Sequence, residues 1–466
     1  MRTLSAMKCT LTLALASVCL CGASLAQDVV LSGTVVTPDK VIPNGWVVVK
    51  GGRIVDIRES APDDARGPRV ETKGIIFPGF VDLHDHPMYN VFQRWTPKVK
   101  FRNRYEWRDL VEYNETVGRP GGELQRKDDQ TFCDIDEFVE LKALIGGTTS
   151  ITGISARRGF AEPVPKCVAG LARNLDWAPG FDGTTVGLGR VENALGVTPR
   201  DLKDADIERI AGELKQGKID LLLIHVAEGA PGDLESATEF RALEGIGLLG
   251  PNTAIIHGVA LGADQFGEMA KVGTALVWSP RSNFELYGFT ADVGAANQQK
   301  VKIALAPDWS PTGSTNSLAE LKYAREFSHQ KLSDLFSAEA LFRMSTLVPA
   351  QIAHVEGKVG SLAKDHYADL FVLSGNASDS YAALAAAMPQ DVQLVLVGGV
   401  PIYGSGPLMN AFSVKTEVLK VCDETMYLNS AALPPEPFSA VVARLAADMK
   451  PYGNIKDLGP IAECAK

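Results

Sequence analysis

Apolar positions along this chain follow one pattern at the two ends and another in the middle. From Val29 to Ile57, short β-rich runs are broken by prolines and glycines, which predicts a small antiparallel sheet. From about residue 75 to 345, apolar runs alternate with longer amphipathic stretches, a pattern typical of repeated βα units. After about Gln351 the β-rich runs return, at Asp369–Leu373 and Val392–Val397. We therefore expect the chain to revisit its first small domain.

The clearest strands of the middle region are short and almost wholly apolar. Their spacing in the second half, about 20 to 30 residues, suits consecutive βα repeats of a parallel barrel. Further strands are expected between Ser155 and Lys215, where the pattern does not place them. The strands that it does place are Thr148–Ile154, Leu221–Val226, Ala254–Val259, Ala275–Trp278 and Ile303–Ala306.

The N-terminus has the features of a secretory signal peptide. Arg2 and Lys8 precede an uncharged apolar run from Leu11 to Cys21, and Ser24-Leu25-Ala26 supplies a small-x-small cleavage pattern before Gln27. The apolar run is about half of the roughly 20 residues that span a bilayer, so a permanent anchor is the weaker interpretation. We expect export to the periplasm or the medium with loss of residues 1–26, leaving no membrane anchor.

Composition and charge exclude several classes of protein. The chain has 466 residues, of which 45% are hydrophobic and 22% charged, so wholesale disorder is excluded. Its 46 basic and 56 acidic residues give a net charge of −10, and no Lys/Arg run could follow a phosphate backbone. We therefore expect a small-molecule substrate and no nucleic acid partner, while a homo-oligomer stays open.

Four cysteines remain after the predicted cleavage: Cys133, Cys167, Cys422 and Cys464. An even number in an oxidising compartment allows three pairings if all four are bridged. We prefer a Cys422–Cys464 bridge, which would tie a proline-containing C-terminal segment back on itself. The alternative is that some of the four are ordinary buried thiols.

Side chains that can bind a metal stand where apolar segments end. His84 and His86 follow such a segment at i and i+2, so in an extended chain both imidazoles face the same side and can reach one ion. His225, His257 and Asp308 end three later apolar runs. Because the C-terminal ends of parallel barrel strands meet at one face, these positions predict a metal site there.

A single histidine at a strand end is more often a structural residue than a ligand, but a His-x-His pair followed by this series makes chance improbable. The chain has seven histidines in all. The other three, which lie in helical or surface-like stretches, are expected to be structural: His329, His354 and His366.

These residues belong to longer motifs that resemble a known family. The motifs are Gly74–His86, His225–Glu228, His257-Gly258, Ser279–Asn283, Asp308, Gly357–Leu362 and Ala368–Leu370. With them the chain resembles the amidohydrolase superfamily from about residue 28 to 405, closest to its cytosine/guanine deaminase and triazine hydrolase-like branch. The combined motifs are specific to the superfamily but not to a substrate.

The resemblance implies an α/β fold, a distorted (β/α)8 TIM barrel with a small β-sandwich domain built from the N- and C-terminal segments. We expect a signal peptide at 1–26, sandwich parts at 27–74 and 351–405, the barrel at 75–350, and a C-terminal extension at 406–466.

The resemblance also implies roles for the site residues. His84, His86, His225 and Asp308 would hold the metal, which lowers the pKa of a bound water toward about 7. Asp308 would accept the proton of that water, and His257 would hold the nucleophile or polarise the substrate. Glu228 would protonate the leaving nitrogen, unless it is an ordinary strand-end carboxylate.

Two departures from the family limit this comparison. Trp309-Ser310-Pro311 follows Asp308, where deaminase relatives more often have glycine. The expected strand Thr184–Arg190 offers no lysine to bridge two metals, and Lys166 and Glu192 are poorly supported substitutes. We therefore expect one divalent ion, zinc before iron.

Clues to the substrate are few. An aromatic and basic stretch after His86 could overhang the site, stack on a flat substrate and bind an acidic group. Alternatively, it is a solvated loop whose rings cover the barrel. The candidate substrate contacts are Trp95, Arg102, Arg281, Asn283 and Trp309.

Taken together, the sequence predicts an exported, metal-dependent amidohydrolase that cleaves a non-peptide C–N bond in an amide, lactam, urea or amino-heterocycle. Export slightly favours amide hydrolysis over deamination of a nucleobase-like heterocycle. A dipeptidase-like enzyme and a non-catalytic metal- or solute-binding barrel are the remaining alternatives. The presence of both Glu228 and His257 argues against the last one, because binding a metal alone requires neither.

Overall fold

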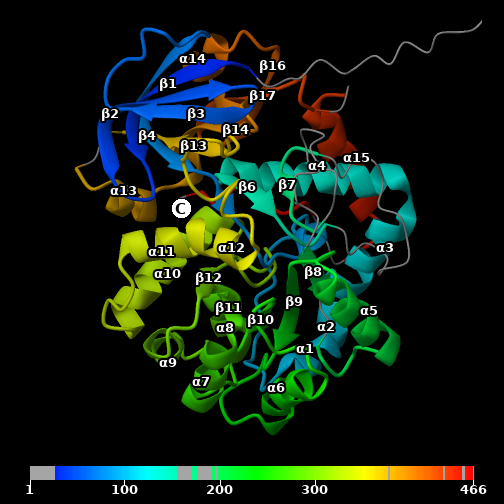
Figure 1. The fold of residues 1–466 in the computed structure, drawn as a ribbon. Coiled ribbons are helices and arrows are strands. Elements are labelled where there is room, and N and C mark those ends of the chain that lie inside the picture. Colours follow the sequence, from blue (N-terminus) through cyan, green and yellow to red (C-terminus); the bar gives the residue numbers. More distant parts are fainter. Residues whose placement is uncertain are drawn as a thin grey trace, which may run out of the picture.

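The two ends of the chain meet in one large sheet beside a barrel-like part (Figure 1). The computed structural model describes residues 27–154, 170–176, 191–194, 198–375, 378–433, 436–453 and 457–464. Among these residues, no helix is both long and apolar enough to cross a membrane.

Nine strands form the large sheet, in the order β16-β17-β15-β14-β13-β4-β1-β2-β3. The N-terminal segment supplies β1 (Val29–Val36), β2 (Val41–Lys50), β3 (Arg53–Arg58) and β4 (Arg69–Pro78). The C-terminal segment supplies β13 (Leu370–Leu373), β14 (Val392–Val397), β15 (Val400–Ser405), β16 (Thr416–Val421) and β17 (Glu424–Asn429). The two segments join where β4 pairs antiparallel with β13.

This arrangement bears on the predicted two-part β domain. Both ends do contribute to it, but their strands are hydrogen-bonded into one continuous sheet, and a sandwich stays a prediction. Strands β16 and β17 extend the sheet past residue 405, so part of the segment expected as an extension belongs to it. A local pattern of apolar residues predicts a strand but not the distant strand with which it pairs.

The barrel-like part contains eight strands within the described residues, in parallel sheets of three and five. The first sheet has β5 (Phe80–Val81), β6 (Thr148–Ile151) and β7 (Arg173–Asn174). The second has β8 (Val191–Ala194), β9 (Leu221–Val226), β10 (Thr253–His257), β11 (Ala275–Trp278) and β12 (Ile303–Leu305).

The two parallel sheets do not merge into a closed barrel, although hydrogen bonds cross between them at both edges. On one side, Asp308 N donates to His84 O at 3.0 Å and His86 N donates to Asp308 O at 3.2 Å. On the other, Val191 N donates to Leu175 O at 3.3 Å. The result is a TIM-barrel-like α/β fold in which the β5 and β12 ends lie side by side.

Helices surround the barrel strands. Before the second sheet lie α1 (Arg104–Arg108), α2 (Val111–Tyr113), α3 (Arg119–Lys127) and α4 (Asp129–Ile145), and α5 (Asp204–Lys215) lies between its strands β8 and β9. Between and after its strands lie α6 (Leu234–Gly245), α7 (Ala263–Val272), α8 (Pro280–Tyr287), α9 (Val293–Gln298), α10 (Ser317–Lys331), α11 (Ala338–Met344) and α12 (Leu347–Ile352). Helices α13 (Ser380–Ala386), α14 (Gly406–Ala411) and α15 (Phe438–Met449) belong to the C-terminal segment. Single turns of 3-10 or π helix cover Pro87–Tyr89, Asn114–Gly118 and Pro389–Asp391.

Barrel strands such as β9 are buried on both faces. Leu221 and Leu223 join one apolar cluster, while Leu222 and Ile224 join another on the opposite face. Because successive strand residues point to opposite sides, a strand covered on both sides reads as a continuous apolar run. This is why the strands of the second half could be predicted from the sequence.

The predicted strands match the structure closely where the sequence is apolar. Leu221–Val226 and Ala275–Trp278 are confirmed to the residue, whereas β6 and β10 end earlier than predicted, at Ile151 and His257. The expected strand Thr184–Arg190 lies outside the described residues. Strands β7 and β8 fall where the pattern placed none, because they are short and polar.

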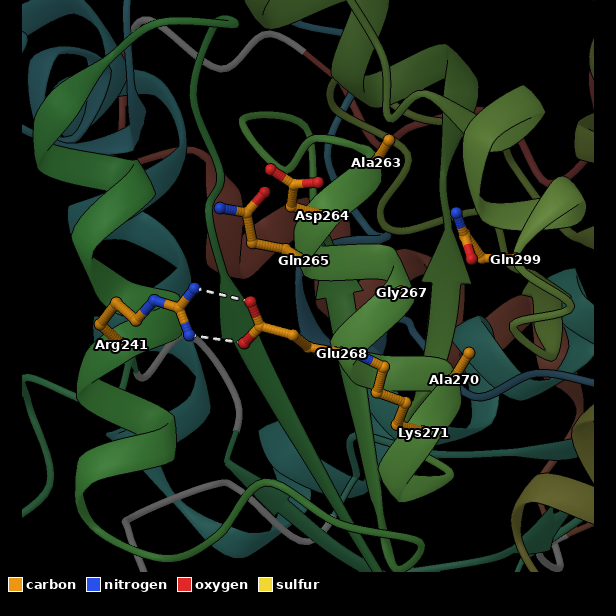
Figure 2. Close-up of a pocket in the computed structure, with 9 residues that line it drawn as sticks. All are labelled: Arg241, Ala263, Asp264, Gln265, Gly267, Glu268, Ala270, Lys271 and Gln299. Carbon is orange, nitrogen blue, oxygen red and sulfur yellow. Dashed lines mark hydrogen bonds and ion pairs between the residues drawn. The ribbon is translucent and has the colours of Figure 1, made fainter.

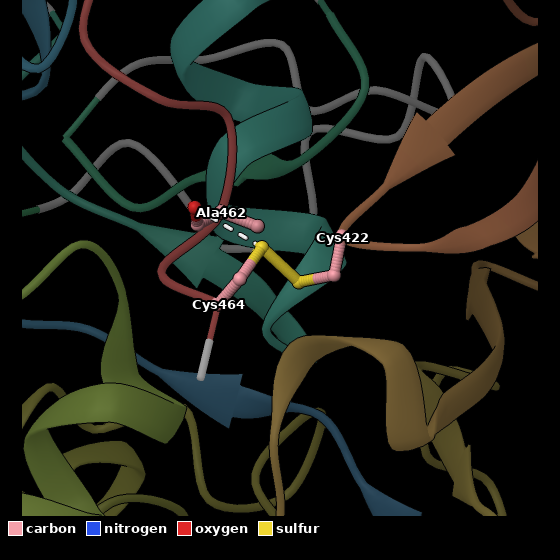
Figure 3. Close-up of a disulfide and its surroundings, with 3 residues drawn as sticks. All are labelled: Cys422, Ala462 and Cys464. Atoms are coloured by element: carbon pink, nitrogen blue, oxygen red, sulfur yellow. Dashed lines mark hydrogen bonds between the residues drawn. A yellow bond between two sulfur atoms is a disulfide. The ribbon is translucent and has the colours of Figure 1, made fainter. Parts of the chain in front are cut away.

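The preferred disulfide is confirmed: Cys422 and Cys464 are bonded (Figure 3). It joins the end of the chain to the turn between β16 and β17. Cys133 is also disulfide-bonded, while Cys167 lies outside the described residues.

Candidate metal centre

The five predicted ligand and catalytic positions at the strand ends converge. His84 and His86 follow β5, His225 lies near the end of β9, His257 ends β10, and Asp308 follows β12. Their ligand atoms form two overlapping groups, each within 4.8 Å: His84, His225 and His257, and His84, His86 and Asp308. Sequence spacing alone had suggested this convergence, and the barrel-like fold provides it.

The geometry and burial of this cluster suit a divalent cation. Oδ1 of Asp308 lies 3.4 Å from His84 Nε2 and 3.5 Å from His86 Nε2. Within the described part of the chain, the buried atoms His84 Nε2 and His225 Nδ1 make no hydrogen bond. Buried polar atoms normally find a partner, and imidazole with carboxylate is a donor set that zinc and related ions prefer.

Burial also keeps the histidines neutral, the form that binds a metal. It lowers the pKa of His86 to about 3 and that of His257 to about 4, and the pKa values of His84 and His225 fall well below their usual range. Burial conversely raises the pKa of Asp308 well above its usual value. A cation among these side chains would favour the carboxylate form of Asp308.

Three of the non-glycine residues with positive φ lie at the same strand ends. Ala227, His257 and Asp308 have φ values of 58°, 69° and 67°, in the left-handed region that non-glycine residues rarely adopt. Each such residue costs about 1–3 kcal/mol, and residues of this kind cluster at functional sites.

Hydrogen bonds to neighbouring elements orient the first histidine. His84 Nδ1 lies 3.0 Å from Ser279 Oγ, which leaves Nε2 directed toward Asp308. Such a partner on the far ring nitrogen fixes the orientation of a metal-binding imidazole. Asn90 connects the segments that follow β5 and β12, because its Nδ2 donates to Asp85 and its Oδ1 accepts from Ser310 N at 2.7 Å.

Glu228, which comes two residues after β9, is held from three sides. Tyr287 OH donates to Glu228 Oε1 at 2.7 Å, and Arg104 Nη1 lies 3.5 Å from Oε2. His257 Nε2 lies 3.6 Å from the same Oε2. Tyr287 is itself fixed by Trp107, whose Nε1 donates to its hydroxyl at 2.8 Å. Glu228 is therefore a constrained carboxylate beside the histidine cluster.

Sequence reasoning missed three of these partners: Arg104, Ser279 and Tyr287. Arg104 was noticed as one of several basic residues after His86, but nothing in the sequence marked it as 3% exposed. Ser279 lies in a motif that resembled the family, and its contact with His84 depends on the barrel-like fold. Tyr287, at the end of α8, carries no local signal.

Two of the predicted substrate contacts adjoin the cluster. The Trp309 ring centroid lies 5.7 Å from that of His86, and Trp309 also contacts Trp107 and Tyr113. Asn283 contacts His257 directly, with Nδ2 2.8 Å from Nδ1. Its side chain is therefore engaged with a site residue.

The other three predicted substrate contacts lie further from the histidine cluster. Trp95 is buried in an aromatic group with Phe101, Trp107 and Tyr113, one ring behind Trp309. Arg102 is 79% exposed and bonds Glu106. Arg281 bonds Ser314 and Glu463 near the end of the chain. The structure does not bring Arg102 and Arg281 to the histidines, because acidic partners hold them elsewhere.

The remaining histidines lie apart from the cluster, as predicted. His329 is exposed and pairs with Asp334 at 3.0 Å. His366 lies against Ser361, and His354 is exposed.

A separate surface hollow of about 690 Å³ lies between α6 and α7 (Figure 2). Arg241 and Glu268 form a two-point ion pair across it, at 2.5 and 2.8 Å. None of its lining residues belongs to the metal-site cluster. The hollow is therefore not part of the candidate metal centre.

The chain is similar to proteins of one catalytic family. Residues 218–402 match the model of the amidohydrolase family. A 5-methylthioadenosine/S-adenosylhomocysteine deaminase of Teredinibacter turnerae is 25% identical over 350 residues, covering 70% of this chain and 78% of the relative. The Symbiobacterium thermophilum protein of the same name is 24% identical over 427 residues, covering 81% and 94%. A 5'-deoxyadenosine deaminase of Methanococcoides burtonii is 22% identical, covering 81% and 92%.

Solved structures share the fold. A zinc-bound adenosine deaminase from Xanthomonas campestris superposes with a TM-score of 0.69 at 18% identity, covering 92% of this chain and 99% of the other. A triazine hydrolase from Arthrobacter aurescens gives 0.67 at 16%, covering 91% and 99%. These likenesses support the TIM-barrel-like fold.

Proposed function

We propose, from the premise that residues 218–402 form an amidohydrolase family domain, that this protein is a metal-dependent hydrolase that deaminates an aminated heterocycle. The bond cleaved would be a C–N bond outside a peptide. One observation carries the proposal: a cation-binding cluster and the constrained pair His257 and Glu228, 3.6 Å apart, lie at one face.

That pairing favours an enzyme over a binding protein. A cation needs only the donor atoms of the cluster, whereas Glu228 adds a carboxylate held by Tyr287 and Arg104. Residues held in such geometry are what proton transfer requires. A non-catalytic barrel would have no use for this constraint.

We assign the cation to His84, His86, His225 and Asp308, and expect one ion, most readily zinc. The ion would supply Lewis-acid activation of a water molecule. Support comes from the buried, partnerless His84 Nε2 and His225 Nδ1 described above and from the zinc bound in the Xanthomonas campestris adenosine deaminase.

The chain's own residues would then move the protons. Asp308 would accept a proton from the attacking water, because a carboxylate that binds a cation would still have a lone pair to offer. Glu228 carries a proton to the departing nitrogen, which otherwise leaves as a poor, anionic group. His257 presents its Nε2 beside Glu228 Oε2 and holds the reacting oxygen in place.

The substrate is better described as an aminated heterocycle than as a simple amide, although export alone had slightly favoured the amide. The three deaminases compared above are named for adenosine-type compounds. The Trp309 ring, 5.7 Å from that of His86, places an aromatic side chain beside the cluster, against which a flat ring would stack.

A substrate panel tests the proposal. Zinc-loaded protein is given adenosine, 5'-deoxyadenosine, 5-methylthioadenosine, guanine, aminotriazines, simple amides, lactams and N-acyl amino acids, and released ammonia or amine is measured. We expect ammonia from at least one aminated heterocycle. Turnover should be lost in Glu228→Gln and retained in Glu268→Gln, the matched change in the surface hollow of Figure 2. Turnover of amides alone would replace deamination by amide hydrolysis, and inertness toward the whole panel would contradict both.

We also propose that the protein is exported. The charged, apolar and small-residue segments at the N-terminus support this, as does the Cys422–Cys464 disulfide. Fractionation of producing cells, with N-terminal sequencing, should find a mature chain that begins at Gln27 outside the cytoplasm. A full-length chain in the cytoplasm would contradict it.

A further inference from the structure

A chain of hydrogen bonds runs from β11 to His257. Trp278, the last residue of β11, donates from Nε1 to Thr290 Oγ1 at 2.7 Å. The Thr290 hydroxyl donates to Asn283 Oδ1 at 3.3 Å. Asn283 Nδ2 then lies 2.8 Å from His257 Nδ1. Trp278 and Asn283 are fully buried, so this series of hydrogen bonds is shielded from water where it begins and where it meets His257.

The direction of this chain follows from what each group can do. An indole nitrogen can only donate, so Thr290 Oγ1 accepts from Trp278. The hydroxyl hydrogen is then free to point at Asn283 Oδ1, the acceptor that the structure gives it. With its oxygen committed to Thr290, Asn283 turns its NH2 group toward His257. An amide NH2 can only donate, so His257 Nδ1 must accept.

We propose that Trp278, Thr290 and Asn283 form a donor chain that holds the ring proton of His257 on Nε2. None of the three touches a reacting atom, so they are positioning residues that act through His257. A neutral imidazole has one N–H, and an accepting Nδ1 leaves that proton on Nε2. Nε2 is the atom that faces Glu228 Oε2 at 3.6 Å.

This tautomer fixes which group donates and which accepts between His257 and Glu228. A protonated Nε2 cannot ligate a cation, so this chain removes His257 from the group that it shares with His84 and His225. His84 differs, because its Nδ1 faces the Ser279 hydroxyl, which can accept as well as donate, so this contact does not hold the ring proton on Nε2. His257 is therefore a hydrogen-bond donor beside the metal site, and Glu228 is the acceptor that faces it.

The tautomer does not depend on the proposed function, whereas its catalytic meaning rests on it. As a donor, His257 holds a developing negative oxygen and takes no proton from water. This leaves proton carriage to Asp308 and Glu228.

Nitrogen NMR of protein labelled with 15N-histidine tests the tautomer without any substrate. Long-range 1H–15N correlations distinguish protonated from unprotonated ring nitrogens, and His257→Gln identifies the signal. In metal-free and zinc-loaded protein alike, we expect His257 Nε2 in the protonated range and Nδ1 in the unprotonated range. The reverse pattern, or loss of the Nε2 proton when zinc binds, would overturn the proposal.

His366 provides an internal control in the same spectrum. Its Nδ1 lies 3.1 Å from the backbone oxygen of Ser361, which can only accept. The neutral ring should therefore carry its proton on Nδ1, the opposite of His257, and should not respond to changes in the donor chain.

Two variants test the chain itself. In Asn283→Asp, a carboxylate faces Nδ1 and can only accept, so we expect the Nδ1 signal of His257 to move into the protonated range. Thr290→Val removes the donor that orients the amide, so an intermediate, averaged Nδ1 shift is expected. An unchanged His257 signal in Asn283→Asp would overturn the proposal, and one in Thr290→Val would remove Thr290 and Trp278 from it. Thr290→Val also serves if Asn283→Asp fails to fold.

Discussion

Two buried aspartates, one beside the large sheet and one beside the barrel strands, have opposite surroundings. Asp369, immediately before β13, receives Arg173 Nε at 2.5 Å and Nη2 at 3.1 Å, together with the backbone N–H of Gly398 at 2.6 Å. Asp308, beside the barrel ends, faces the Nε2 atoms of His84 and His86. Both residues are 3% exposed.

The difference separates structure from function. Asp369 has a cation supplied by the chain, and it fastens the barrel-like part to the nine-stranded sheet at normal backbone geometry. Asp308 faces neutral rings, with no arginine or lysine of the described residues paired to it, on a backbone with φ of 67°. A buried acid that is left for an external cation indicates a metal site, whereas a buried acid with its own arginine indicates an architectural contact.

The same substitution at both acids should therefore give different results, and the largest effect on activity is expected at Asp308. On the proposed function, Asp308→Asn removes a metal ligand and the proton acceptor, so turnover should fall by at least about 10³-fold and bound metal should be lost. The melting temperature should change little once metal-free proteins are compared. Steady-state ammonia release and elemental analysis measure both, and a variant that retains metal and turnover would remove Asp308 from the site.

Asp369→Asn should show the converse. The change takes the carboxylate away from the buried Arg173 guanidinium, and losing one partner of a buried pair costs about 3–5 kcal/mol in the free energy of unfolding. The turnover of each folded molecule should stay near that of the wild type. Urea unfolding and active-site-normalised kinetics separate these outcomes, and a loss of turnover without loss of stability would refute the division between the two acids.

A smaller effect is expected at Tyr287, which sharpens the account of Glu228. Tyr287→Phe deletes the hydrogen bond to Glu228 Oε1, worth about 1.5–3 kcal/mol for a charged acceptor, or roughly 10- to 100-fold in kcat. KM and metal content should hardly change. Tyr113→Phe is the matched control, because Tyr113 packs in the aromatic group. If Tyr287→Phe has an equal effect in the Glu228→Gln background, Tyr287 does not act through Glu228.

The smallest effect is expected at Arg102, which the sequence had suggested as a substrate contact. Its side chain is 79% exposed and pairs with Glu106 within one turn. Arg102→Ala should change kcat/KM by less than about twofold, since exposed ion pairs contribute little. A tenfold rise in KM would show that this side chain reaches the substrate after all.

Features that leave a local pattern along the chain could be predicted from the sequence. Strands such as Leu221–Val226 could be predicted because burial on both faces leaves a continuous apolar run. His84 and His86 could be paired because i and i+2 in an extended chain face one side. The polar, two-residue β7 carries no such pattern.

Contacts between side chains on distant elements could not be predicted from local patterns. Tyr287 and Arg104 meet Glu228 only after α8, α1 and β9 are brought together, and sequence periodicity does not encode this arrangement. Asn283 was predicted as a substrate contact, whereas its hydrogen bond with His257 depends on the fold and carries no sequence signal. The pairing of β4 with β13 likewise joins segments almost 300 residues apart.

The central claim is that one cation, held at the barrel ends, makes this chain a hydrolase. The most direct test titrates zinc into metal-free protein while ammonia release from a responsive aminated heterocycle is measured. The account predicts no turnover without metal, a linear rise on addition and a plateau at about one equivalent per chain. Full turnover by folded, metal-free protein, or a plateau only at two equivalents, would contradict it.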